Sequence, residues 1–322
     1  MSISRISSIL LSAGVLLSAC ESPGEPLRME TLAGYDFADF IDARPGGVAI
    51  EGRLILPEKG LPRAAVILSH GAAGTGGRQE RAATLFAKAG WAALILDHFE
   101  ERGVRSVARD QIRVSEQQMA SDIFRARDSL ATRLDLEASK IGAIGWSKGA
   151  TAVTLAAVSR LQGMLAPDTP PLAFAAALYP FCGFQLDHEA LASPLLLLLA
   201  GEDDWTPSTP CVRQAEAWRA TDQPVSVKVY ETAAHGFDSR SGRFEIDSAI
   251  TVRDTSPRCT LRVDKDGRTV TLDGAHSLAT PDGRRAFLAV CGERGVTFAG
   301  DEESRRDALA RLLAFANGSI SD

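Results

Sequence analysis

Short apolar runs alternate along most of the chain with segments whose apolar residues recur at helical spacing. Six runs are continuously apolar and end in turn signals, which is typical of strands buried on both faces. The segments between them carry helix-end signals, such as a capping serine or a glycine after the last turn. This alternation predicts an α/β fold with a mostly parallel sheet and helices on both faces. The predicted strands cover residues 64–71, 91–99, 140–147, 174–181, 193–201 and 225–231, and the helices cover 78–90, 111–134 and 208–220.

The pattern differs near both ends of this core. Residues 48–57 alternate apolar and polar side chains, which predicts an antiparallel edge hairpin. Residues 258–298 hold β-rich runs with two Asp-Gly hairpin signals, and 301–318 form an amphipathic helix with acidic residues at its start. We therefore expect one domain over residues 35–322, with a β-hairpin insertion at 258–298 placed before the last helix.

The first twenty residues are set apart from this pattern. Arg5 and an apolar stretch over 6–17, too short to span a membrane as a stable helix, precede the letters LSAC. This end resembles the lipobox of bacterial lipoproteins, in which the peptide is cut before the cysteine and lipid is attached to the sulfur. We expect a signal peptide over residues 1–19, lipid on Cys20 and a flexible tether over 20–34. An ordinary secretory signal is the alternative. The lipobox implies a bacterial cell-envelope lipoprotein that faces the periplasm and is anchored to the membrane.

Composition narrows the class of protein. The chain has 322 residues, 45% of them hydrophobic, which is enough for a sizeable core. Its formal net charge is −6, and it has no long block of lysine and arginine. A nucleic-acid footprint needs clustered cations, so we exclude nucleic acid as a partner.

Four cysteines remain if Cys20 carries lipid, and the predicted compartment is oxidising. Three pairings are formally possible, and four free buried thiols are the alternative. We favour Cys182 with Cys211 and Cys259 with Cys291, because each of these pairs closes a short loop around a compact stretch of the predicted fold.

Ser147 lies between Gly145 and Gly149 in the run IGWSKG, where a predicted strand ends and a helix pattern begins. A G-x-S-x-G spacing at such a turn is typical of a nucleophile elbow, which exposes the serine oxygen above the sheet. The glycines let the strand and the helix approach closely. The helix start adds partial positive charge, and the backbone N–H of Lys148 would be one oxyanion donor.

A nucleophilic serine needs an imidazole within hydrogen-bond reach and a carboxylate behind it, and in this fold the acid and then the histidine follow the serine. His235 comes directly after a predicted strand, where a loop at the carboxyl end of the sheet would aim it at Ser147. His276 lies in the insertion and is interpreted as surface. The acid comes from GEDDWTP, in which Asp203 and Asp204 are adjacent and only one can meet the histidine. We predict Asp203, with Asp204 as the alternative.

A second oxyanion donor is expected from the glycine-rich loop ILSHGAAGTGG, which follows the first long strand. The backbone N–H of Ala72 is the predicted donor, and that of Gly71 is the alternative. His70 in the same loop precedes the serine in the chain, so we expect it to hold the loop rather than to act as a base.

Taken together, these residues resemble the dienelactone hydrolase family of α/β-hydrolases. The resemblance implies an α/β-hydrolase sheet, no metal or other cofactor, and hydrolysis of a small-molecule ester or lactone through an acyl-enzyme. The namesake enzymes use cysteine at the elbow, so Ser147 favours a general serine esterase, and the insertion at 258–298 is a second departure. The resemblance covers roughly residues 48–238 and the last helix, through LSHGAAG, LDHFEERGV, IGWSKGA, LYPFCG, GEDDWTPSTPC and AAHGFD.

Two other functions use the same sequence features. A peptidase needs the same three side chains and differs in its pocket and its leaving group. A non-catalytic envelope lipoprotein would keep the scaffold and use its cleft or its insertion to bind a ligand.

Overall fold

The computed structural model describes residues 24–41, 45–167 and 169–320. Within these ranges one eight-stranded sheet has the order β1-β2-β4-β3-β5-β6-β7-β8. Neighbouring strands from β4 to β8 are parallel, and β1 and β2 complete one edge in antiparallel register. The strands are β1 (Glu25–Leu32), β2 (Pro45–Ile55), β3 (Ala65–Ser69), β4 (Ala92–Asp97), β5 (Ile141–Trp146), β6 (Ala175–Leu178), β7 (Leu195–Ala200) and β8 (Val225–Tyr230).

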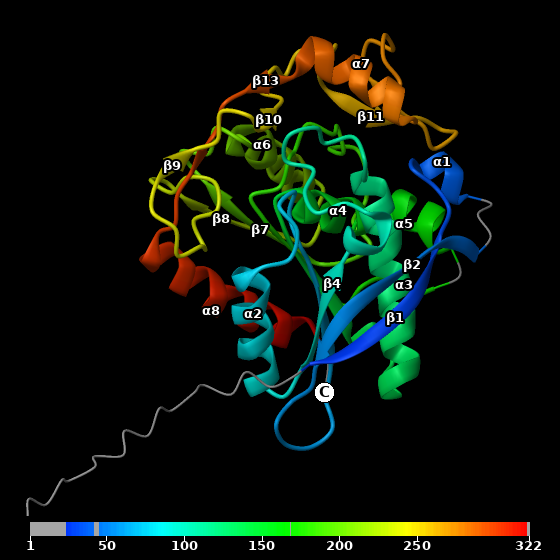
Figure 1. Cartoon of the computed structure of the whole chain (residues 1–322), viewed down its shortest axis with the longest axis vertical. Helices are drawn as coiled ribbons and strands as arrows, with labels where there is room; N and C mark the ends of the chain where they lie inside the picture. Colours follow the sequence, from blue (N-terminus) through cyan, green and yellow to red (C-terminus); the bar gives the residue numbers. More distant parts are fainter. Residues whose placement is uncertain (1–23, 42–44, 168, 321–322) are drawn as a thin grey trace, which may run out of the picture.

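Helices cover both faces of the sheet, as the alternation of strands and helices predicts (Figure 1). The buried side chains of α3, α4, α5 and α6 join one apolar cluster, and those of α2 and α8 join the other. Every residue of β3, β5, β6 and β7 is buried, which explains their continuous apolar sequences. The helices are α1 (Phe37–Phe40), α2 (Gly77–Lys88), α3 (Glu116–Leu134), α4 (Lys148–Ala156), α5 (Ser159–Leu165), α6 (Ser208–Ala220), α7 (Pro281–Cys291) and α8 (Glu302–Ser319), with short 3₁₀ turns at Glu100–Arg102 and Ala138–Lys140.

The tether predicted over residues 20–34 is wrong for residues 25–32, which form the edge strand β1. Alternate side chains of this strand face the core: Met29 and Thr31 are buried, whereas Arg28 and Glu30 are exposed. This period of two is a strand signal that the nearby prolines and glycine obscured. Strand β2 consequently lies between β1 and β4 and not at the predicted edge. The signal peptide and Cys20 lie outside the described residues.

The insertion is only partly β-structure. Strands β11 (Leu261–Val263) and β12 (Thr269–Thr271) form a hairpin, but the second predicted β-run is the helix α7. Thr280 caps this helix by accepting a hydrogen bond from the N–H of Gly283 at 3.1 Å, and Pro281 occupies the first turn. The predicted Asp-Gly hairpin turn is therefore the first turn of a helix. Short strand pairs frame the insertion: β10 (Ile250–Thr251) with β13 (Glu293–Arg294), and β9 (Phe244–Glu245) with β14 (Thr297–Phe298).

Both predicted disulfides are present. Cys182, after β6, is bonded to Cys211 of α6, and Cys259 is bonded to Cys291 at the end of α7. The first bond ties a loop at the carboxyl edge of the sheet to a helix, and the second closes the insertion on itself. Across the described ranges, no helix combines the length and the apolar character needed to cross a membrane.

Candidate active site

Ser147 sits in a strained turn between β5 and α4. Its backbone φ is +52° and its ψ is −117°, a conformation that L-residues rarely adopt. The flanking glycines permit it. A Cβ on Gly145 would lie 2.2 Å from the carbonyl oxygen of Gly149, and a Cβ on Gly149 would lie 2.4 Å from that of His70. Side chains at either position would therefore push the strand, the helix and the neighbouring loop apart.

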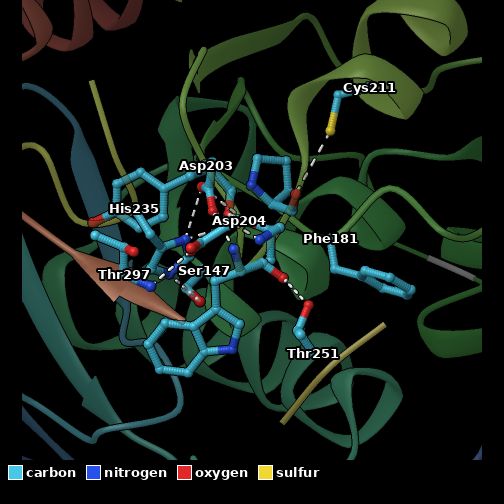
Figure 2. A network of polar contacts seen from close by, with 12 residues as sticks. Ser147, Phe181, Asp203, Asp204, Cys211, His235, Thr251 and Thr297 are labelled. Atoms are coloured by element: carbon cyan, nitrogen blue, oxygen red, sulfur yellow. Dashed lines mark hydrogen bonds and ion pairs between the residues drawn. The ribbon is translucent and has the colours of Figure 1, made fainter. Parts of the chain in front are cut away.

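The loops after β7 and β8 bring the predicted acid and base to this serine (Figure 2). The hydroxyl of Ser147 donates to Nε2 of His235 at 3.0 Å, and Nδ1 of His235 donates to Oδ2 of Asp203 at 2.8 Å. The side chains of His235 and Asp203 are only 2% and 0% exposed. An imidazole that is held in this way can take the proton of the hydroxyl, which makes the serine oxygen a nucleophile.

Asp203 is fixed by the backbone that follows it. Its Oδ1 accepts hydrogen bonds from the N–H groups of Trp205 at 2.9 Å and Thr206 at 2.8 Å. The Thr206 hydroxyl lies 3.0 Å from Oδ2 of the same carboxylate. These contacts hold the carboxylate at a fixed angle to the imidazole. Sequence analysis did not single out Thr206, although an aspartate followed by a threonine three residues later is a common turn pattern.

Asp204 points in another direction. Its Oδ1 accepts the backbone N–H of Thr297 at 2.7 Å, and its carbonyl oxygen accepts Nε of Arg253 at 2.8 Å. Figure 2 shows Asp204 directed at Thr297, while Asp203 faces His235. Asp204 therefore links the acid loop to the end of the insertion and does not contact the imidazole.

The glycine-rich loop after β3 lies directly against Ser147. A Cβ on Gly71 would be 3.2 Å from the Cβ of Ser147. In the part of the chain that the structure covers, the backbone N–H groups of Ala72 and Lys148 donate to no protein acceptor. Both predicted donors therefore remain available for a ligand oxygen.

His70 holds this loop, as predicted, and is fully buried. Its Nε2 accepts the backbone N–H of His98 at 3.1 Å, so its Nδ1 carries the proton and donates to the carbonyl of Gly71 at 2.8 Å. A histidine whose two nitrogens are used in this way is not free to serve as a base.

A second Ser-His-Asp set lies beneath the loop, and sequence analysis missed it. Ser69 Oγ is 2.9 Å from Nε2 of His98, and Nδ1 of His98 is 2.8 Å from Oδ2 of Asp122, which Arg102 binds with two nitrogens at 2.8 and 2.9 Å. Burial lowers the pKa of His98 to about 4, so the ring is neutral at physiological pH. The set is buried away from solvent and supports the carboxyl ends of β3 and β4.

A pocket lies beside Ser147 and extends under the insertion. Its walls are mostly apolar, because the segment after β6 contributes two phenylalanines and the insertion contributes four large apolar side chains. Trp205 of the acid loop also lines the pocket. The apolar lining from these segments is Phe181, Phe184, Leu261, Leu278, Phe287 and Leu288.

Three charged side chains also line this pocket. Nζ of Lys148 donates to Glu116 Oε1, and Nη1 of Arg284 donates to Glu116 Oε2 at 2.6 Å. Burial alone would raise the pKa of Glu116, but the two cations outweigh it and lower the pKa to about 2. Burial lowers the pKa of Lys148 to about 8 against the pull of Glu116. Glu116 and Arg284 are 168 positions apart, so no local pattern could have paired them.

Comparison with known proteins agrees with this geometry. The family model described as "Dienelactone hydrolase family" matches residues 50–255. A crystal structure from Klebsiella pneumoniae, provisionally named a dienelactone hydrolase, superposes with a TM-score of 0.54 at 16% identity and covers 91% of this chain and 99% of its own. A propionate-bound thermophilic esterase from the Planctomycetes species Thermogutta terrifontis gives a TM-score of 0.50 at 18% identity, over 68% of this chain and 86% of its own. At these identities the two structures establish the fold. No curated protein matches the sequence.

Proposed function

Because the chain belongs to the dienelactone hydrolase family, we propose that it is a serine hydrolase that cleaves carboxylic esters or lactones. The observation that carries this proposal is the continuous hydrogen-bonded line from Ser147 through His235 to Asp203, with contacts of 3.0 and 2.8 Å. Serine, imidazole and carboxylate in this order are what acyl transfer to a serine requires.

In the proposed reaction, Oγ of Ser147 attacks the ester carbonyl while Nε2 of His235 takes its proton. Asp203 keeps the imidazole in the tautomer that can accept this proton and stabilises the imidazolium. The same imidazolium then protonates the leaving alcohol, which leaves the acyl group on Ser147. Water, deprotonated by His235, releases the acid and restores the serine.

The developing oxyanion lies between two backbone donors in this scheme. These are the N–H groups of Lys148 and Ala72, with Gly71 as the alternative to Ala72. The N-terminus of α4 adds partial positive charge at the same place. Donors that are fixed before the reaction need no reorganisation when the charge develops, and each is typically worth about 10²–10³ in kcat.

The pocket beside Ser147 has a volume of about 80 Å³ and suits the acyl group. An apolar cavity of about 150 Å³ holds benzene. In proportion to that volume, the pocket beside Ser147 holds an acyl chain of about two to four carbons. We therefore propose a short-chain ester as the substrate.

Replacement of the serine tests the proposal. Ser147→Ala should lower kcat/KM for p-nitrophenyl butyrate by at least about 10⁴-fold, and a serine-directed phosphonate should label the parent only. The matched control is Ser139→Ala, an exposed serine before the opposite end of β5, which should leave the rate unchanged. Within a graded series of p-nitrophenyl esters, the rate should fall beyond butyrate. Cleavage of peptide amides in preference to esters would indicate a peptidase, and binding without turnover would indicate a non-catalytic protein.

We also propose that the mature protein is lipidated at Cys20 and faces the periplasm. The letters LSAC support this, and two disulfides are expected in an oxidising compartment. Labelled palmitate should be incorporated into the parent and not into Cys20→Ala.

A further inference from the structure

A second groove adjoins the pocket beside Ser147 and is much larger. The two share Phe181, Phe184 and Val252 in their walls, so they lie side by side. The volume of the groove is about 570 Å³, against about 80 Å³ for the pocket. A substrate whose acyl chain fills the pocket would therefore have room for a large second part in the groove.

The walls of the groove come from three segments that are held together. They are the loop after β6, the beginning of α6, and the stretch that leads into the insertion. The Cys182–Cys211 disulfide bonds the first wall to the second. The N–H of Leu261 donates to the carbonyl of Gly183 at 2.7 Å, which joins the insertion to the first wall. The groove is thus formed before any ligand arrives, which lowers the cost of binding.

Polar groups in these walls lack partners within the described residues. Gln214 is only 7% exposed, and its amide nitrogen makes no hydrogen bond. Oδ1 of Asp187 is buried and also makes none. Arg213 lines the same groove, and no carboxylate of the described chain forms an ion pair with it. The guanidinium of Arg213 is exposed to the groove, whereas Nε2 of Gln214 and Oδ1 of Asp187 are covered and become available to a ligand only when their side chains turn.

The charge of the groove argues against an ionic ligand. Two arginines, Arg213 and Arg253, are balanced by two aspartates, Asp187 and Asp254. Arg253 is already occupied by Glu293 and two backbone carbonyls. A neutral ligand that both donates and accepts hydrogen bonds fits this set, and hydroxyl groups do both. The aromatic rings at the junction with the pocket add an apolar surface for the carbon face of a ring.

We propose that this groove binds the alcohol part of the ester, and that this part is a neutral polyhydroxylated ring, such as a glycoside. The inference rests on the proposed function, because it assigns the leaving group of that same reaction. The substrate would be a sugar that carries a short acyl group, with the acyl chain in the pocket beside Ser147 and the sugar hydroxyls on Gln214, Asp187 and Arg213.

The test compares two substrates with the same acyl group. Release of acetate from methyl 6-O-acetylglucopyranoside and from ethyl acetate is measured with the full-length chain. We expect kcat/KM for the glucoside to be at least tenfold higher. Arg213→Met and Gln214→Leu should each lower this preference by about tenfold while the ethyl acetate rate stays within twofold. Arg219→Met, at an exposed position of the same helix outside the groove, is the control and should change neither rate.

The outcomes separate the two proposals. Equal rates for both substrates in the parent, or an unchanged preference in both groove variants, would overturn the leaving-group site and leave the hydrolase proposal intact. Failure to cleave either acetate, together with no turnover of p-nitrophenyl esters, would overturn both. Arg213 is exposed, so its replacement does not threaten the fold and keeps the test decisive.

Discussion

Asparagine in place of Asp203 should disable the imidazole by reversing its tautomer. In the parent, Oδ1 of Asp203 accepts the N–H groups of Trp205 and Thr206, and Oδ2 faces Nδ1 of His235. In Asp203→Asn, the amide oxygen has to stay on the two backbone donors, because an NH₂ group there would face them with donors only. The NH₂ group is therefore turned to His235.

An NH₂ group in that position donates to Nδ1, so the proton of the neutral ring moves to Nε2. A protonated Nε2 cannot accept the proton of Ser147. We expect kcat to fall by about 10³–10⁴-fold, which corresponds to about 4–5.5 kcal/mol of lost transition-state stabilisation. The side chain is fully buried, so water cannot replace the missing acceptor.

The neighbouring acid supplies a matched control. In Asp204→Asn the amide oxygen can still accept the N–H of Thr297, so kcat should stay within about twofold of the parent value. Both variants are assayed with p-nitrophenyl butyrate after thermal unfolding has shown that they are folded. Equal losses in the two variants, or more than a tenth of the parent rate in Asp203→Asn, would refute the tautomer argument.

Two predictions concern stability. Gly145→Ala should lower the free energy of unfolding by at least about 3 kcal/mol, because its Cβ would lie 2.2 Å from a backbone oxygen. Gly163→Ala, in open space on α5, should be neutral or raise the free energy of unfolding by up to about 1 kcal/mol. Urea titration measures both changes. In Arg284→Met, Glu116 loses one of the two cations that lower its pKa to about 2, below its unfolded value of about 4.3. The stability that this depression provides is complete above about pH 4.3 and is lost as the pH falls toward 2. The difference in the free energy of unfolding between the parent and Arg284→Met should therefore shrink over that pH interval. A difference that does not change with pH would contradict the argument.

The buried strands were the easiest part of the fold to predict. Strands β3 to β7 are apolar runs because helices cover both faces of the sheet at that point, whereas the edge strand β8 alternates apolar and polar side chains. The wrong secondary-structure predictions concern short sequence signals that fit two different structures. The Asp-Gly pair at the start of α7 fits a hairpin turn, but Thr280 and Pro281 before it make it a helix start. The alternation in β1 was overlooked because prolines and a glycine surround it.

The site was predictable as far as local geometry determines it. Ser147 and His235 each follow a predicted strand in a recognisable run, so the sheet brings them to one edge. The prediction of Asp203 over Asp204 agrees with the structure. The sequence alone contains no physical reason for it, because the difference depends on which carboxylate the backbone of residues 205–206 binds. The ion pair between Glu116 and Arg284 joins distant segments and left no sequence signal.

The match to the family model ends at residue 255, and the insertion that roofs the pocket begins just after it. Ser147, His235 and Asp203 thus lie inside the matched range, whereas four apolar side chains of the pocket wall lie outside it: Leu261, Leu278, Phe287 and Leu288. Mutation can remodel the roof, exchange it or lengthen it without touching the serine, the imidazole or the carboxylate. Grafting residues 258–298 onto a relative should therefore change part of the pocket lining while the serine, the imidazole and the carboxylate stay in place.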